Sequence, residues 1–369
     1  MRKPDFATSS LGLLAAAVVV LQATAIFAGP TLPYYPASGI GQAVPAATAT
    51  VMQPPQADAA ITAAKARYAT ALPRVRLFTG AADAPLPGTV TSVRRSHEAR
   101  QLFELAGYDL AAVRAGESDV PRLFLAQVPN DLRKLREVEE RKSIFIKTVL
   151  PLILRVNEEI AEDRSRLLAL DARLKAGAVP GPAERRWLNS LAAAYGLEAA
   201  QPGGLPDLAA LLLRVDEIPV ALALAQSIEE SGWGTSRFAR EGNALYGQYA
   251  WSESAGLKPA GSGPDTAHVV RSFDRVIDAA AAYSLNLNTH PAYHDFRAAR
   301  ASLRAAGKPL DAEALAGHLL RYSERGQDYV RTLRIIIRAN RLDELQQASL
   351  ASGMVVAMAD EAPNRRDES

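Results

Sequence analysis

The sequence predicts a mostly helical protein with one small β element. From Arg94 onward, apolar residues recur at helical spacing, most clearly over 131–176, where they lie three, four and seven positions apart. Strand-like composition is confined to 245–250 and 268–273, and the segment 256–266 between them is rich in glycine and proline. We therefore expect helices to form most of the fold, with a small hairpin or lobe beside them.

Turn signals such as Gly107 and Gly177 bound the predicted helices. Pro151 lies inside the longest helix and is expected to kink or split it. Four carboxylates of that helix are expected on a solvated face: Glu158, Glu159, Glu162 and Asp163. The predicted helices cover 95–108, 131–176, 183–195, 207–215, 221–231, 235–240, 275–288, 292–306, 311–321 and 327–340.

Composition disfavours several classes of function. The chain has 42 basic and 40 acidic residues and no basic cluster, which argues against a nucleic-acid partner. It has no cysteine, hence no disulfide, thiol nucleophile or cysteine-based metal site. His97 begins a pattern like that of zinc proteases, but Gln101 stands where the second histidine is needed. His290 and His294 are separated by a proline that interrupts the helical turn. We expect no metal and no cofactor.

The amino terminus predicts export. Arg2 and Lys3 precede an apolar stretch at 11–28, and small residues at 23–25 suit cleavage of a signal peptide. Because the stretch is close to the minimum length for a membrane span, an uncleaved anchor is the alternative, and it would tether the protein to the inner membrane. We expect an exported protein of the periplasm or cell envelope. Residues 29–90 are expected to be a Pro/Ala-rich linker.

The most distinctive stretch is 221–234, Ala-Leu-Ala-Leu-Ala-Gln-Ser-Ile-Glu-Glu-Ser-Gly-Trp-Gly. A helix this apolar on all sides belongs in a core, and Gly232 can end it just after Glu230. Burial and the negative end of the helix dipole both raise the pKa of a carboxyl group at that place. A carboxyl group that keeps its proton near neutral pH is suited to act as a glycosidic general acid. The alternative is a helix end whose glutamate points to water.

Several segments in the same order resemble bacterial glucosaminidases of glycoside hydrolase family 73, most closely their Bax-type branch. The central segment is AQSIEESGWGTSRFAREGNALYGQ at 225–248. Downstream come RSFD at 271–274, LNLNTHPAYHDF at 285–296 and YSERGQDYV at 322–330. Upstream are VEERKSIF at 138–145 and LPLILRVNEEI at 150–160. The resemblance spans about 95–345 and implies a lysozyme-like α+β fold, with an active cleft between a helical lobe and the small lobe.

The resemblance also assigns roles to residues. Glu230 aligns with the catalytic glutamate of the family, whereas Glu229 occupies a position that the family usually fills with an apolar residue. The two side chains differ by about 100° around the helix, so they cannot point the same way. Tyr322 and Tyr329 lie where the family carries an active-site tyrosine, although each could instead only pack one helix on another.

Further residues are candidates for binding sugar or for a second acid. Glu253 and Asp265 lie in the loop region where related enzymes place a second acid, although the N-acetyl group of a substrate can replace that acid as nucleophile. Trp233 is a candidate for stacking on a sugar ring and also for a packing wedge. The full set of expected substrate contacts is Gln226, Trp233, Asn243, Tyr246, Gln248 and Trp251.

Together these observations predict an exported hydrolase that cleaves β-1,4 bonds next to N-acetylglucosamine in peptidoglycan glycan strands. The alternatives are a non-catalytic glycan-binding or scaffold protein and a lyase. The sequence identifies no protein partner. The expected domains are a signal peptide or anchor at 1–28, a linker at 29–90, a helical region at 91–214, a lysozyme-like glucosaminidase domain at 215–345 and a flexible tail at 346–369.

Overall fold

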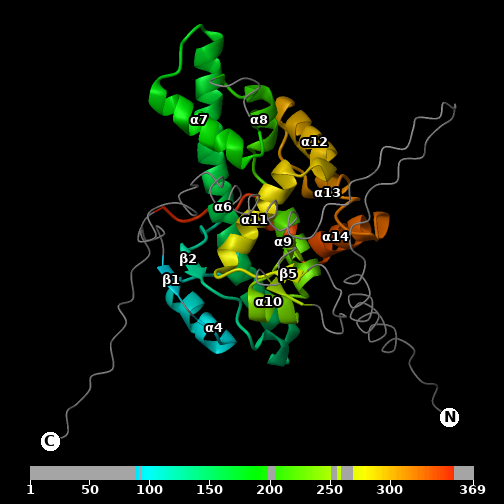
Figure 1. Cartoon of the computed structure of the whole chain (residues 1–369). Helices are drawn as coiled ribbons and strands as arrows, with labels where there is room; N and C mark the ends of the chain where they lie inside the picture. Colours follow the sequence, from blue (N-terminus) through cyan, green and yellow to red (C-terminus); the bar gives the residue numbers. More distant parts are fainter. Residues whose placement is uncertain (1–88, 92, 198–203, 251–255, 259–268, 353–369) are drawn as a thin grey trace, which may run out of the picture.

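The structure is a computed structural model that describes residues 89–91, 93–197, 204–250, 256–258 and 269–352 of the 369-residue chain (Figure 1). The predicted signal peptide or anchor and nearly all of the predicted linker lie outside the described residues, as do Trp251, Glu253 and Asp265.

Helices dominate the described part of the chain, which confirms the predicted fold class, mostly α with a small β element. The elements in order are β1 (Thr89–Thr91), α4 (Ser96–Leu105), α5 (Leu110–Ala115), β2 (Leu123–Leu125), η1 (Leu132–Lys134), α6 (Val138–Lys175), α7 (Pro182–Ala194), α8 (Leu208–Arg214), α9 (Val220–Ser231), α10 (Arg237–Gly242), β3 (Tyr249–Ala250), β4 (Gly256–Leu257), β5 (Val269–Arg271), α11 (Val276–Thr289), η3 (Pro291–Tyr293), α12 (His294–Ala305), α13 (Ala312–Ala316), α14 (Gln327–Ala339) and η4 (Leu342–Leu345).

Helix α6 runs without a break through Pro151, so the expectation that this proline splits the helix is wrong. A proline inside a helix costs about 3 kcal/mol. Every residue of α6 from 144 to 157 except Lys147 is buried, and this part of the helix packs on α9 and α11. Burial of that many apolar side chains outweighs the cost of one proline.

The same enclosure overturns the expectation that Glu159 lies on a solvated face. The Glu159 side chain is 4% exposed and forms an ion pair with Arg155, whose side chain is 6% exposed. Glu158 accepts hydrogen bonds from Arg155 at 3.0 Å and from Arg122 at 2.6 Å. Arg155 and Glu159 are therefore paired inside the protein, whereas Glu158 is half-buried and Glu162 is exposed as predicted.

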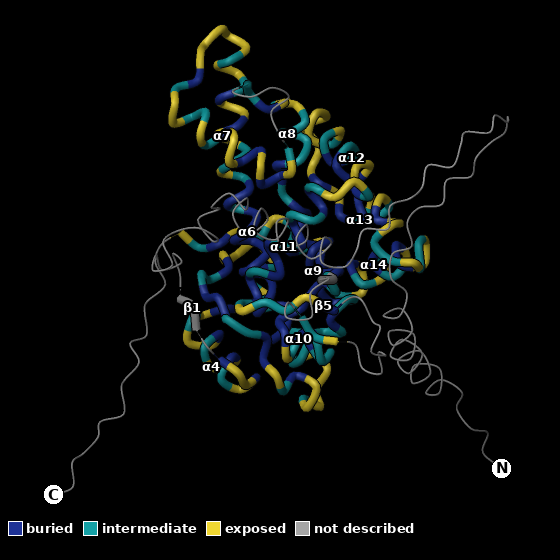
Figure 2. The backbone as a smooth tube through the Cα atoms, in the orientation of Figure 1, coloured by how far each residue is buried: buried dark blue, intermediate teal, exposed yellow. Residues whose placement is uncertain are grey.

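The helical region before residue 215 and the region after it share one hydrophobic core. Figure 2 shows buried segments concentrated where α6, α9 and α11 meet. The predicted boundary between 214 and 215 is therefore not a gap in the core, although the domain limits themselves stay a prediction.

The carboxyl-terminal end of the described chain is held against this core. Leu350 forms an isolated bridge with Val120, the N–H of Val120 donates to the carbonyl of Ser349 at 2.8 Å, and the N–H of Ala351 donates to the carbonyl of Val120 at 2.9 Å. The prediction of a flexible tail from residue 346 is wrong for residues 346–351, because backbone pairing and the burial of Leu350 fix them.

The predicted β element is a three-stranded antiparallel sheet in the order β3-β5-β4; a second sheet, which the sequence analysis did not predict, pairs β1 with β2 in parallel. Strand β4 begins at Gly256, inside the segment that the sequence predicted as a loop. A Cβ at Gly256 would lie 2.0 Å from the carbonyl oxygen of Val270, so only glycine allows the two strands to approach this closely.

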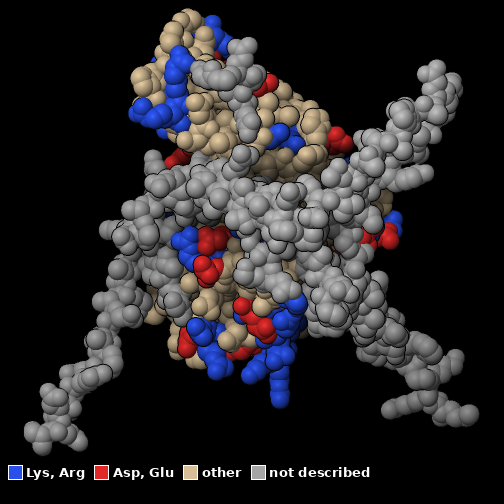
Figure 3. Space-filling model, in the orientation of Figure 1, with Lys and Arg blue, Asp and Glu red and all other residues tan. Residues whose placement is uncertain are grey.

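Helix α7 and the outer end of α6 project as an arm at the top of Figure 1. On the face shown in Figure 3, lysine and arginine side chains gather over this arm, and both signs of charge are mixed elsewhere. In the described part of the chain, no helix combines the length and the apolar character that a membrane span needs.

Candidate active site

Glu230 lies at the carboxyl-terminal end of α9, the helix that the sequence singled out. The helix is buried from Val220 to Ile228 and ends where Gly232 takes the left-handed conformation, with φ of 57°. The backbone N–H of Trp233 then donates to the carbonyl of Ile228 at 3.2 Å, which closes the last turn. The helix therefore delivers the Glu230 carboxyl to the edge of the core.

Three consecutive residues after Glu230 and Ser231 have left-handed backbones. Trp233 has φ of 60° and Gly234 has φ of 71°, following Gly232. A Cβ at Gly234 would lie 2.9 Å from the Val128 side chain and 3.0 Å from that of Phe145, so this position excludes any side chain. The Ser231 hydroxyl accepts the N–H of Gly234 at 2.9 Å, which fixes the turn.

Trp233 is a packing wedge in this turn. A left-handed backbone costs a residue with a side chain about 1–2 kcal/mol. Its ring meets that of Phe145 edge-on at 5.8 Å between centroids, and the Lys142 ammonium lies 5.5 Å from its ring centroid. These contacts offset the strained backbone. Trp233 is half-buried, and its stacking on a sugar ring stays a prediction.

The Glu230 carboxyl is half-buried and poised between its two protonation states near neutral pH. Desolvation raises the pKa of Glu230 to about 7, and the nearby Glu229 adds to the rise, whereas the Tyr329 hydrogen bond and Arg325 oppose it. The Tyr329 hydroxyl donates to Oε1 at 2.9 Å. A Cβ at Gly247 would lie 3.1 Å from Oε2, so the Gly247 backbone lies against the second oxygen.

Glu229 lies in a different environment from its neighbour. Its carboxylate forms an ion pair with Arg325 at 2.5 Å, and its side chain is 10% exposed. Arg325 also donates to the Thr332 hydroxyl at 2.7 Å. Glu229 is therefore held by Arg325, whereas the Glu230 carboxyl has no cation bonded to it in the described structure and is bonded by a neutral phenol.

Five tyrosines lie around Glu230 and form what we call the tyrosine cluster: Tyr246, Tyr283, Tyr293, Tyr322 and Tyr329. The rings of Tyr246 and Tyr283 stack at 4.0 Å, and those of Tyr322 and Tyr329 lie parallel at 5.6 Å. The Tyr322 hydroxyl donates to the carbonyl of Tyr246 at 3.1 Å. Burial raises the pKa values of Tyr283, Tyr322 and Tyr329 far above the ordinary 10, so these phenols stay neutral.

Two members of the cluster, Tyr283 and Tyr293, were missed by the sequence analysis. Tyr283 had a weak signal, since it is a hydroxyl-bearing ring directly after the alanine run 279–282 of a buried helix. Tyr293 lies inside the segment 285–296 that carries the family resemblance, and its ring lies 5.9 Å from that of Tyr322.

The prediction that Gln226 contacts substrate is wrong. Gln226 has no exposed surface, and both ends of its amide are held by protein groups. The Tyr283 hydroxyl donates to Oε1 at 2.6 Å, and Nε2 donates to the Tyr329 hydroxyl at 2.9 Å. Gln226 shares the helix face of Glu230 one turn earlier, but that turn points into the core rather than toward solvent.

The structure describes the surroundings of three further residues that the sequence analysis expected to contact substrate. Asn243 ends α10 with φ of 51°, and its amide donates to the carbonyl of Phe273 at 3.0 Å; a contact with sugar stays a prediction. Tyr246 is 2% exposed and stacked on Tyr283, so the prediction that its ring stacks on substrate is wrong. Gln248 is half-buried, its Oε1 has no hydrogen-bond partner, and a substrate contact stays a prediction.

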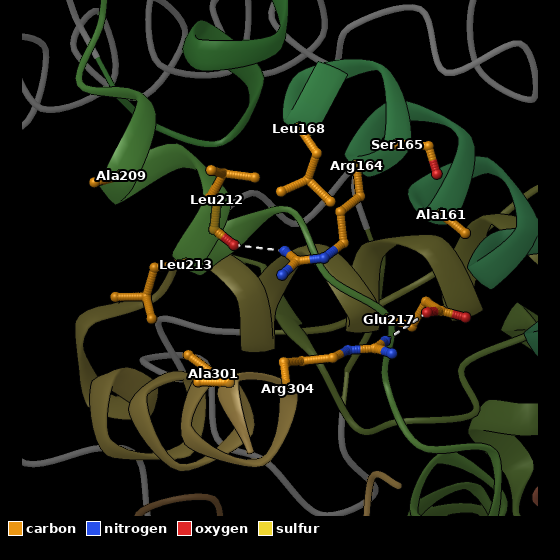
Figure 4. Close-up of a pocket in the computed structure, with 11 residues that line it drawn as sticks. Ala161, Arg164, Ser165, Leu168, Ala209, Leu212, Leu213, Glu217, Ala301 and Arg304 are labelled. Carbon is orange, nitrogen blue, oxygen red and sulfur yellow. Dashed lines mark hydrogen bonds and ion pairs between the residues drawn. The ribbon is translucent and has the colours of Figure 1, made fainter. Parts of the chain in front are cut away.

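Among the described residues, no group of three or more histidine or acidic side chains is arranged to hold a metal ion. A surface depression of about 730 Å³ lies between α6, α8 and α12 (Figure 4), and neither Glu230 nor any tyrosine of the cluster lines it. Arg164 on its wall donates to the carbonyls of Leu212 and Val215 at 2.7 Å, and Arg304 pairs with Glu217 at 2.5 Å. The arginine side chains that line the depression are therefore engaged in hydrogen bonds and ion pairs that stabilise the fold.

The comparisons with known proteins agree with this arrangement. A family profile described as mannosyl-glycoprotein endo-beta-N-acetylglucosaminidase matches residues 207–342, which contain α9, the small sheet and α14. The fold and this match define a protein with a glucosaminidase domain, a class of glycan hydrolases.

A curated relative, Protein bax of Escherichia coli (strain K12), is 34% identical over 199 residues, which cover 54% of this chain and 69% of that protein. The chain therefore belongs to the Bax-type glucosaminidase family, as the resemblance predicted. No solved structure matches the chain.

Proposed function

We propose that this protein is an exported peptidoglycan hydrolase that cleaves β-1,4 bonds at N-acetylglucosamine, with Glu230 as general acid. The observation that carries the proposal is a half-buried carboxyl group with its pKa raised to about 7, inside the segment that matches the glucosaminidase family; the resemblance aligns this residue with the catalytic glutamate of the family. Such a group is protonated in a large fraction of molecules at neutral pH and can give its proton to a leaving oxygen.

In the proposed mechanism, Glu230 protonates the glycosidic oxygen as the bond to the anomeric carbon lengthens and an oxocarbenium-like transition state develops. The resulting carboxylate is stabilised by the hydrogen bond from Tyr329, which is stronger to the charged form than to the neutral one. Tyr329 thus helps Glu230 to complete the proton transfer, and Tyr322 keeps the Tyr329 ring in place.

The attacking group on the opposite face of the sugar comes from one of two sources. Glu253 or Asp265 would act as base or nucleophile, or the N-acetyl group of the substrate would serve as internal nucleophile. Substituting each acid with its amide separates these routes, because the substrate-assisted route needs neither residue.

Export belongs to the proposal and is supported by the basic residues and the apolar stretch at the amino terminus. Peptidoglycan lies outside the inner membrane, so a signal peptide or an uncleaved anchor at 11–28 would bring the domain to its substrate. Fractionation of cells that express the full chain tests this: recovery in the cytoplasm would contradict it.

The decisive experiment is digestion of purified sacculi, followed by mass spectrometry of the released fragments. Wild type is expected to release fragments with reducing N-acetylglucosamine ends, and Glu230→Gln is expected to lose about 1,000-fold or more in turnover. Anhydro-muramyl products would identify a lyase, and binding without release would identify a glycan-binding protein.

Glu229→Gln is the matched control, since Glu229 lies next to Glu230 on the same helix but pairs with Arg325. It is expected to keep turnover within about tenfold of wild type, because the proton donor is intact. Equal losses in the two variants would contradict the assignment of Glu230.

A further inference from the structure

Three hydrogen bonds beneath Glu230 all point the same way. The Tyr283 hydroxyl donates to Oε1 of Gln226 at 2.6 Å, Nε2 of Gln226 donates to the Tyr329 hydroxyl at 2.9 Å, and the Tyr329 hydroxyl donates to Oε1 of Glu230 at 2.9 Å. Gln226 has no exposed surface, and Tyr283 and Tyr329 are each 1% exposed. We call these three bonds the hydrogen-bond chain; its inner part is shielded from water.

The direction of the chain follows from the chemistry of its groups. An amide oxygen only accepts and an amide NH₂ only donates, whereas a phenol can do either. Because Oε1 of Gln226 faces the Tyr283 hydroxyl, Tyr283 must donate to it, and because Nε2 faces Tyr329, the Tyr329 oxygen must accept. The oxygen of Tyr329 is then occupied as acceptor, and its own proton is directed to Glu230.

Ring packing holds both phenols in these orientations. Tyr246 stacks on Tyr283 with 10° between the ring planes, and Tyr322 lies parallel to Tyr329 with 3° between them. Tyr322 is itself tied to the Tyr246 backbone by its hydroxyl. The two stacked pairs therefore hold the phenol oxygens within hydrogen-bond distance of the Gln226 amide and of Glu230.

We propose that Gln226 is a positioning residue that holds the Tyr329 hydroxyl as a donor to Oε1 of Glu230 and so places the transferable proton on Oε2, the oxygen beside Gly247. The inference rests on the proposed function of Glu230. It adds that the glycosidic oxygen is protonated from the side of Gly247, where the backbone carries no side chain to block the approach.

The charged groups near Glu230 do not depend on Gln226. Glu229 on α9 forms its own ion pair with Arg325, which lies just before α14, and the phenols of Tyr293 and Tyr322 stay neutral because burial raises their pKa values. An uncharged replacement of Gln226 leaves all these charges in place. A change in the Glu230 pKa in such a variant therefore reports the hydrogen-bond chain.

The first test is Gln226→Met, which keeps the length of the side chain and removes the amide. The Tyr329 oxygen is then free to accept a proton from the neutral Glu230 acid, so the neutral form gains a bond and the Glu230 pKa rises by about one unit. The readout is titration of the carboxyl by carbon-13 NMR of glutamate-labelled protein, with the signal assigned by its loss in Glu230→Gln. This measurement needs no turnover.

In sacculus digestion, the alkaline limb of the pH–rate profile of Gln226→Met is expected to shift to higher pH by the same one unit. Maximal turnover is expected to fall about tenfold. A purely structural role would lower turnover equally at every pH.

Tyr283→Phe is the second variant. It keeps the aromatic ring but removes the hydroxyl, so the side-chain amide of Gln226 is free to flip. It is expected to raise the Glu230 pKa in the same direction.

Ser227→Ala is the matched control, since Ser227 is the next residue, has no exposed surface, and bonds only the carbonyl of Leu224 through its hydroxyl. Its Glu230 pKa is expected to equal that of wild type. An unchanged pKa in both Gln226→Met and Tyr283→Phe, or an equal rise in Ser227→Ala, overturns the inference; if Gln226→Met does not fold, Tyr283→Phe decides. Full turnover of Glu230→Gln alongside shifted titrations would refute the proposed function instead.

Discussion

Replacing Glu230 with glutamine should stabilise the folded protein above neutral pH while it abolishes turnover. The carboxyl has an ordinary pKa of 4.5 and a pKa of about 7 in the folded protein. Because the folded-state pKa lies above the unfolded one, the contribution of Glu230 to the free energy of unfolding is complete below pH 4.5. Wild type loses this contribution as the pH rises through 7.

The size of the effect follows from the two pKa values. Each pKa unit corresponds to about 1.36 kcal/mol, so the complete loss is about 3 kcal/mol. Because the residue is half-buried and retains some solvent, about 2 kcal/mol is the better expectation at pH 8. Glutamine has no charge to desolvate and can accept the same hydrogen bond from Tyr329.

Urea unfolding at pH 4.5, 6, 7 and 8 measures this difference. The free energies of unfolding of wild type and Glu230→Gln should agree at pH 4.5 and separate in favour of the variant up to about pH 8. Glu229→Gln should show no such gain, because it breaks the ion pair with Arg325. A difference that does not change with pH would refute the argument that burial holds the proton on Glu230.

Three further substitutions test other parts of the structure. Gly247→Ala should reduce turnover by roughly 100-fold and cost about 1–2 kcal/mol in stability, because its φ is 60° and its Cβ would lie 3.1 Å from Oε2 of Glu230; wild-type turnover would contradict the assigned side of proton transfer. Gly234→Ala should cost about 2–4 kcal/mol in urea unfolding, since φ is 71° and its Cβ would meet Val128 at 2.9 Å; a cost below about 1 kcal/mol would argue against this close packing. Asp216→Asn should cost about 3–5 kcal/mol, because a buried carboxylate that binds Arg304 at 2.9 Å is lost; equal thermal unfolding temperatures would contradict this.

Much of the fold was predictable because the signals are local. Gly232 was expected to end α9 just after Glu230, and it does, since only the left-handed conformation closes that turn. The strand-like segments at 245–250 and 268–273 contain β3 and β5. The family resemblance was needed for the functional class, because helical spacing alone predicts only a mostly helical protein.

The errors concern what surrounds each helix, which periodicity along one segment does not encode. Glu159 was expected in water because charged residues usually face it, but α6 is enclosed at that level and supplies Arg155 as partner. Gln226 was expected near the substrate because it shares a face with Glu230. Only the position of α14, which brings Tyr329, shows that this part of the face is interior.

The contacts of residues 346–351 with the core determine which part of the chain can fold independently. The family profile ends at residue 342, yet the first turn of α9 depends on Gln346, whose side-chain oxygen accepts the N–H of Ala221 at 3.1 Å. Residues 349–351 in turn are paired with Val120, far upstream of the match. A fragment cut at the limits of the family match would lack Gln346 and Val120, and would expose the first turn of the helix that carries Glu230. We therefore expect residues 207–342 to fold stably only together with the upstream helices and residues 343–351.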